Sequence, residues 1–166
     1  MTGKGALAEG PLLIGVGTEH RHDDSCGLEV ARRLRARSHG RFRVVEAIGE
    51  STALLDLWEG EARVVVVDAA RSGALAGTHR AVEVVADVAS PSASTSTHGF
   101  SIAEAIALGR VLGRMPARLT LHTLEAADVS MGDGLSAPVA AAADRLVDLL
   151  EHELGRAPTP WGARHA

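Results

Sequence analysis

The stretch Val64-Val65-Val66-Val67-Asp68 decides the fold of this chain. Four consecutive valines are apolar on both faces of a strand, which is typical of a strand buried inside a parallel sheet. A carboxylate follows at the point where this strand, predicted over residues 63–67, should end. In open α/β sheets, ligand sites lie outside the carboxyl ends of the strands. The stretch therefore predicts a parallel sheet and a site at one of its edges.

A second apolar run shows the same arrangement near the beginning of the chain. Residues 12–16, with the sequence LLIGV, predict another buried strand, and Asp23 and Asp24 follow it in the next loop. The carboxyl ends of parallel strands meet at the same edge of a sheet. We therefore expect the two strands to deliver acidic side chains to one place.

The rest of the chain alternates between strand and helix patterns. Further strands are predicted over residues 43–47, 80–85 and 118–124, and helices over residues 28–36, 51–58, 101–113 and 136–154. The strands at 63–67 and 80–85 have no helix between them, so one antiparallel pairing is expected. The order predicts an α/β fold, a three-layer sandwich in which a mostly parallel twisted sheet of about five strands has helices on both faces. We expect a single domain over residues 11–155, between a flexible leader at 1–10 and a flexible tail at 156–166.

Composition excludes several classes of function. The net charge is -4 and aromatic residues make up 2% of the chain, which argues against nucleic acid and against an anionic membrane as partners. The single cysteine, Cys26, excludes an internal disulfide framework and fits a reducing compartment, so we expect a cytoplasmic protein. No apolar stretch reaches membrane-spanning length, and the N-terminus lacks the apolar region of a signal peptide.

Asp24, Asp68 and one histidine could form a cluster of two oxygen ligands and one nitrogen ligand. Such a set suits a divalent ion such as nickel, zinc or manganese. His98 is the best third partner because it precedes the predicted helix that starts at Ser101, in a loop of small polar residues. The alternative is that Asp24 caps a helix, Asp68 is a solvated acid at a strand end and His98 is a surface residue. The spacing alone favours this alternative.

Other candidate sites are weaker. Gly15 and Gly17 suggest a dinucleotide-binding loop, but His20 occupies the position of the third glycine, and Asp23 and Asp24 would repel a pyrophosphate. Nucleotide binding is therefore disfavoured.

The remaining polar residues of the first loop carry little signal. His20 and His22 could supply a second metal contact, although a mobile hydrophilic loop is the more probable interpretation. Cys26 is best interpreted as a small loop or core residue. The serine-rich segment 90–97 lacks the G-x-S-x-G motif, which disfavours a serine hydrolase.

Four short motifs follow one another between about residue 12 and residue 154. The first is LIGVGT at 13–18, followed by Asp23, Asp24 and Gly27. The others are VVVDAA at 65–70, STHGFSI at 96–102 and LSAPV at 135–139. In this order they resemble the motifs of the [NiFe]-hydrogenase maturation endopeptidases. The chain departs from that pattern at Thr18, where the family often has asparagine, and in the insert at residues 20–22.

The resemblance implies a function. These endopeptidases remove a C-terminal extension from the hydrogenase large subunit once nickel has been inserted. The family's metal-binding acids and histidine match Asp24, Asp68 and His98, so the resemblance implies that these residues bind nickel supplied by the substrate, without an organic cofactor. Asp23 is a candidate general base by adjacency only. Two alternatives stay open: a non-proteolytic accessory protein that recognises nickel-loaded hydrogenase, and a metal-dependent hydrolase of small substrates.

Overall fold

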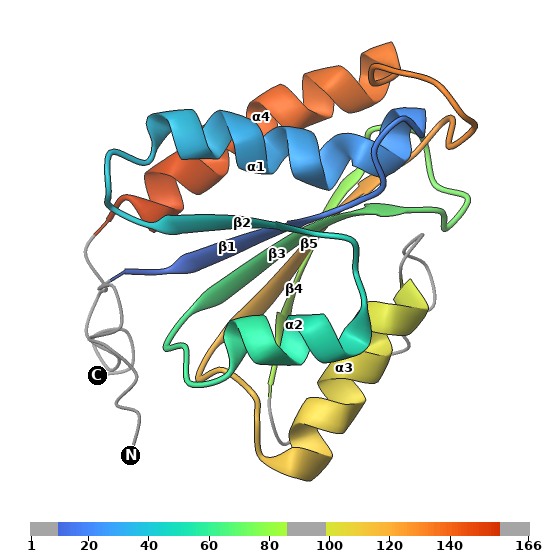
Figure 1. Cartoon of the computed structure of the whole chain (residues 1–166). Coiled ribbons are helices and arrows are strands. Elements are labelled where there is room, and N and C mark those ends of the chain that lie inside the picture. Colours follow the sequence, from blue (N-terminus) through green and yellow to red (C-terminus); the bar gives the residue numbers. More distant parts are fainter. Residues whose placement is uncertain (1–9, 86–98, 157–166) are drawn as a thin grey trace, which may run out of the picture.

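The computed structural model describes residues 10–85 and 99–156 (Figure 1). In this part of the chain the strands are β1 (Leu12–Val16), β2 (Arg43–Ala47), β3 (Val64–Ala70), β4 (His79–Val84) and β5 (Leu119–Glu125). The helices are the 3-10 turn η1 (His22–Ser25) and the α-helices α1 (Cys26–Arg37), α2 (Ser51–Trp58), α3 (Gly99–Leu112) and α4 (Ala137–Leu154). The predicted alternation of strands and helices is confirmed. The predicted leader and tail fall almost entirely outside the described residues.

The strands form one mixed sheet in the order β2-β1-β3-β5-β4. β1 is parallel to both β2 and β3, and β3 is parallel to β5. β4 is antiparallel to β5, so the one expected antiparallel pairing is present, but it joins β4 to β5 and not to β3, the strand that precedes β4 without an intervening helix. The predicted α/β fold is therefore confirmed, and β3 lies at the centre of the sheet.

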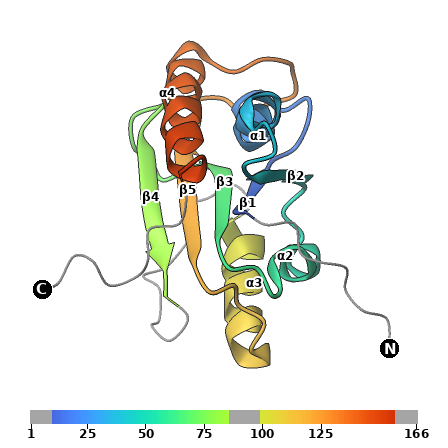
Figure 2. The same cartoon turned by 90° about the vertical axis from the view of Figure 1, so that its left-hand side faces the viewer.

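Helices cover both faces of the sheet, with α1 and α4 on one face and α2 and α3 on the other (Figure 2). The four valines of β3 explain why both faces are filled. Because side chains alternate along a strand, Val65 and Val67 belong to the cluster with α1 and α4, and Val64 and Val66 belong to the cluster with α2 and α3.

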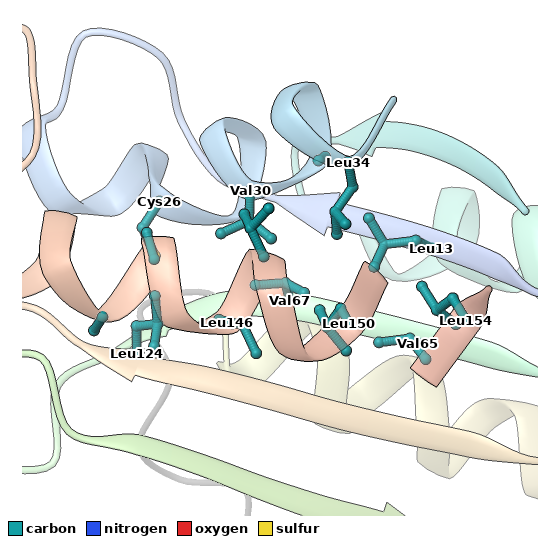
Figure 3. Packing of buried hydrophobic residues seen from close by; sticks show 14 of the residues in the cluster. Leu13, Cys26, Val30, Leu34, Val65, Val67, Leu124, Leu146, Leu150 and Leu154 are labelled. Atoms are coloured by element: carbon teal, nitrogen blue, oxygen red, sulfur yellow. The ribbon is translucent and has the colours of Figure 1, made fainter. Parts of the chain in front are cut away.

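The contact between α1 and α4 contributes much of the first cluster (Figure 3). α4 begins with a proline in its first turn, which suits a position whose N–H has no partner within the helix. Its buried residues recur every three or four positions and so form one apolar stripe. They are Val139, Ala142, Ala143, Leu146, Val147, Leu150 and Leu154.

Two predictions about strand limits and exposure are wrong. β3 does not end at Val67 but continues through Asp68 to Ala70, because its parallel pairing with β5 continues to Glu125. The alternation of residues over 118–124 predicts a strand with one exposed face, yet most residues of β5 are buried. The physical reason is that both faces of β5 pack against helices: Leu124 lies in the cluster with α1 and α4, and Leu119 and Leu121 lie in the cluster with α2 and α3.

All the parallel strands end at one edge of the sheet, which we call the carboxyl edge, and α1, α2 and α4 begin there (Figure 1). α3 also begins toward this edge. Only residues 113–118 join the end of α3 to the start of β5, so the helix must run back from the carboxyl edge to the opposite one.

Candidate functional site

The acidic side chains predicted from the sequence gather at the carboxyl edge of the sheet. Asp24 lies in η1 and Asp68 in β3, and η1 contacts β3. Both side chains are buried, with 5% of Asp24 and 0% of Asp68 exposed. Burial raises the pKa of the Cys26 thiol well above its ordinary value, and the nearby carboxylates of Asp68, Asp23 and Asp24 raise it further. The structure therefore brings all three acids close to the first residue of α1.

Glycines make this close approach possible. A Cβ atom on Gly27 would lie 2.1 Å from the carbonyl oxygen of Val16 and 2.4 Å from that of Val67, so only glycine lets α1 begin directly on β1 and β3. A Cβ atom on Gly17 would lie 2.5 Å from the carbonyl oxygen of Asp24. The Gly-x-Gly motif thus packs against its own chain.

Asp68 is a fully buried carboxylate in the central strand. Its Oδ1 accepts a hydrogen bond of 2.8 Å from the backbone N–H of Ala69. The interpretation of Asp68 as a solvated acid at a strand end is wrong, because β3 extends past it and helices cover both faces. Buried carboxylates in proteins are stabilised by hydrogen bonds, by charged partners or by cations, which makes Asp68 a candidate cation ligand.

Asp23 has different surroundings from its neighbour Asp24. Its carboxylate is fully buried and accepts hydrogen bonds from the backbone N–H groups of Ala127, Asp128 and Ser136 and from the Ser136 hydroxyl, at 2.7–2.9 Å. All four donors belong to the loop between β5 and α4, residues 126–136. The general-base role of Asp23 stays a prediction.

His98, the third predicted ligand, lies outside the described residues. The helix that follows it, α3, begins at Gly99 toward the carboxyl edge. Within residues 10–85 and 99–156, no group of three or more His, Cys, Asp or Glu side chains could hold a metal ion. These residues include Asp24 and Asp68 but not His98, so the three-residue metal site stays a prediction.

The segment at residues 20–22 is not the mobile hydrophilic loop that was expected. Nδ1 of His20 lies 2.6 Å from Oδ1 of Asp133, and Nδ1 of His22 lies 3.0 Å from the carbonyl oxygen of Gly134. The Arg21 guanidinium donates to the carbonyl oxygen of Val129. These contacts fix the insert to the 126–136 loop. Cys26 is a core residue, as expected.

A second buried carboxylate that holds a loop at this edge was not among the residues predicted from the sequence. Glu125, at the end of β5, is 4% exposed and accepts hydrogen bonds from Ser72 N–H, Ser72 Oγ and Gly73 N–H at 2.7–2.9 Å. Glu125 thereby holds the loop that follows β3. The available signal was an acid at the end of an apolar strand, the same signal that identified Asp68.

A groove of about 830 Å³ lies beside Asp24 at the ends of β1 and β2. Thr18, whose N–H donates to the carbonyl oxygen of Asp24 at 3.3 Å, lines one part of it, and Ile48, whose side chain is 75% exposed, lines another. The groove has the volume of a typical ligand site.

Comparison with known proteins points to one protein family. The family model for hydrogenase maturation proteases matches residues 28–153, a range that includes Asp68 and His98 and begins after Asp24. A search of curated proteins gave no match. In the described part of the chain, no helix has the length and apolar character needed to cross a membrane.

Solved structures share the fold. The [NiFe] hydrogenase maturation protease HybD from Thermococcus kodakarensis is 21% identical, with a TM-score of 0.65 over 87% of this chain and 98% of that one. The hydrogenase maturating endopeptidase HybD from E. coli is 19% identical, with a TM-score of 0.65 over 86% and 93% of the two chains. The solution structure of an E. coli endopeptidase gives a TM-score of 0.70 at 19% identity, with the same coverage of 86% and 93%.

Proposed function

This chain belongs to the hydrogenase maturation protease family, and we propose that it removes the C-terminal extension of a [NiFe]-hydrogenase large-subunit precursor after nickel insertion. Family membership makes the protein a peptidase of hydrogenase maturation. The scissile segment, the role of nickel and the cytoplasmic location are parts of the proposal.

One observation carries the proposal: Asp24 and Asp68 lie buried at the carboxyl edge, around the glycine-dependent contact between α1 and the strands β1 and β3. Two carboxylates and an imidazole suit a divalent transition ion. We assign His98, one residue before α3, as the third ligand. In this proposal the three side chains ligate the nickel that the precursor carries.

The proposed mechanism begins with orientation. Nickel held by Asp24, Asp68 and His98 would fix the precursor's C-terminal segment against the carboxyl edge, which converts a loose encounter into an aligned one. The ion would polarise the scissile carbonyl or activate water. Cys26 takes no part as a nucleophile because burial and the neighbouring acids keep its thiol protonated. A precursor without nickel would not dock, so cleavage would act as a checkpoint.

The experiment is a processing assay with nickel-loaded and nickel-free precursor. We expect the wild-type protein to shorten only the nickel-loaded form, and we expect Asp24→Ala and His98→Ala to abolish shortening while both variants remain folded. Asp148→Ala is the matched control, because this acid lies on α4 with its side chain 72% exposed. Normal shortening by both site variants would remove Asp24 and His98 from the mechanism.

The same assay separates the two alternatives. Binding of nickel-loaded precursor without cleavage would identify a non-proteolytic accessory protein. A metal-dependent hydrolase of small substrates would retain its own ion through purification, which elemental analysis of the wild-type protein would detect.

A further inference from the structure

Asp23 connects two segments that lie more than a hundred residues apart in the sequence. Its Oδ2 accepts from the N–H of Ala127 at 2.8 Å, from the N–H of Asp128 at 2.9 Å and from the hydroxyl of Ser136 at 2.8 Å, and its Oδ1 accepts from the N–H of Ser136 at 2.7 Å. A carboxylate has about four lone-pair positions. Donors of the 126–136 loop therefore bind both carboxylate oxygens of Asp23.

Backbone hydrogen bonds reinforce the same connection. The N–H of Asp23 donates to the carbonyl oxygen of Asp128, and the N–H of His22 donates to that of Gly132, both at 2.9 Å. In return, the N–H of Gly132 donates to the carbonyl oxygen of His20 at 2.9 Å. Residues 20–23 and the 126–136 loop thus form one hydrogen-bonded unit.

Asp24 is attached to this unit on one side and to the sheet on the other. Its N–H donates to the carbonyl oxygen of Arg21 at 3.0 Å, and its carbonyl oxygen accepts from Thr18, which follows β1, at 3.3 Å. The backbone that carries the Asp24 side chain is therefore fixed between the end of β1 and the 126–136 loop.

We propose that Asp23 is a positioning residue, whose buried carboxylate holds the 126–136 loop against residues 20–23 and thereby fixes Asp24 at the carboxyl edge. The part of this inference that concerns catalysis rests on the proposed function. Asp23 is not the general base in this account, because its fully buried carboxylate is engaged on both oxygens by donors of the loop.

The first test measures geometry and does not depend on activity. Asp23→Asn preserves the shape of the side chain but turns an NH₂ group toward donor groups of the loop. We expect the amides of Ala127, Asp128 and Asp24 to exchange hydrogen about tenfold faster or more in this variant, and the Asp24 amide resonance to move. An unchanged Asp24 amide in a folded Asp23→Asn variant would overturn the proposal.

The second test measures the site itself. Changes in groups that orient metal ligands typically cost 10–100-fold in metal affinity, so we expect Asp23→Asn to weaken binding of Ni²⁺ alone by about tenfold or more. Processing of nickel-loaded precursor should fall by a similar factor at every pH. A general base would behave differently, because its removal abolishes the acid limb of the pH–rate profile; that result would also overturn the proposal.

Two further variants control for stability. Ser136→Ala removes one of the four donors and should give an intermediate loss in amide protection and in Ni²⁺ affinity. Glu125→Gln removes the buried carboxylate that holds the loop after β3, and should lower stability while Ni²⁺ affinity of the folded protein is retained. Equal losses of affinity in Glu125→Gln and Asp23→Asn would contradict a specific role for Asp23. If the wild-type protein neither binds Ni²⁺ nor cleaves precursor, the proposed function fails, and the Asp24 amide still decides the positioning role.

Discussion

His122 is a buried imidazole in β5, on the same face of the strand as Leu124, whose side chain belongs to the cluster with α1 and α4. Its Nδ1 lies 2.9 Å from Nε2 of His79 in β4, and the two rings are stacked with centroids 5.2 Å apart. Burial, together with the smaller effects of the neighbouring His79 and of Arg63, lowers the pKa of His122 to about 4. Both rings are therefore neutral near pH 7, joined by one shared hydrogen bond.

This histidine pair predicts a loss of stability in mild acid. The unfolded chain takes up a proton on His122 as the pH falls below 6.5, whereas the folded protein resists protonation down to about pH 4. The free energy of unfolding should therefore decrease between these values. We expect His122→Leu to flatten this decrease, as measured by urea denaturation across the range. Identical pH dependence in the variant and the wild-type protein would show that His122 contributes nothing.

Single residues were predictable where a sequence pattern points to them. Asp24 and Asp68 come after runs of apolar residues, which predicts that both lie toward the carboxyl edge, and in the structure Asp24 lies in η1 and Asp68 near the end of β3. The contacts of Asp23 were not predictable, because its four donors come from a loop 104–113 residues away. No local pattern distinguishes an acid that holds a distant loop from an acid that faces a site.

At the scale of elements, the contact of α1 with β1 and β3 depends on Gly27. Gly27→Ala would place a methyl group within 2.4 Å of two backbone carbonyl oxygens, so the start of α1 must shift outward. We expect a destabilisation of about 1–3 kcal/mol or more, measured by urea denaturation, and a loss of precursor processing even in the folded fraction. Full processing by this variant would show that the close approach is not needed at the site.

The packing of α4 gives a second prediction. Leu146 is 2% exposed and packs in the cluster shared with α1, whereas Leu149 on the same helix is 40% exposed. Leu146→Ala should lower the free energy of unfolding by about 2–5 kcal/mol. Leu149→Ala is the matched control and should cost about 1 kcal/mol or less. Equal costs in the two variants would contradict the assigned buried face of α4.

The sequence predicted most elements because their patterns are local. The valines of β3 and the stripe of α4 need no knowledge of neighbours to be recognised. Strand ends depend on partners instead: β3 continues to Ala70 because β5 pairs with it that far. The buried state of β5 depends on the helices that pack on its two faces, and two of these, α1 and α2, lie far from it in the sequence.

At the scale of the whole molecule, three of the four most exposed large apolar side chains in the described part of the chain lie in loops at the carboxyl edge. Ile48, Leu75 and Met131 are 75%, 85% and 76% exposed and belong to the loops after β2, β3 and β5. Val111 is 83% exposed near the end of α3, toward the opposite edge. Single exposed apolar residues are normal, but three loops at one edge surround the candidate site.

We therefore expect Ile48→Ser and Met131→Ser to weaken docking of the precursor. Burying an apolar side chain contributes about 1.5–3 kcal/mol, which corresponds to roughly a tenfold or greater rise in KM for processing. Val111→Ser has comparable exposure and is the control, with an unchanged KM. A rise in KM for Val111→Ser alone would contradict this expectation, because it would place the docking surface at the edge opposite the carboxyl edge.

The architecture as a whole was predictable because strand and helix alternate along the chain, and that order has few solutions. The sequence predicts that the acidic residues meet at one edge, because topology brings the strand ends together. It does not predict how their side chains are oriented there. The proposed function requires that Asp24, Asp68 and His98 ligate one divalent ion.

A crystal structure of the wild-type protein soaked with Ni²⁺ tests this claim most directly. We expect a single anomalous peak ligated by carboxylate oxygens of Asp24 and Asp68 and by the His98 imidazole. A peak elsewhere, or the His98 ring on another side of the molecule from the two acids, would contradict it.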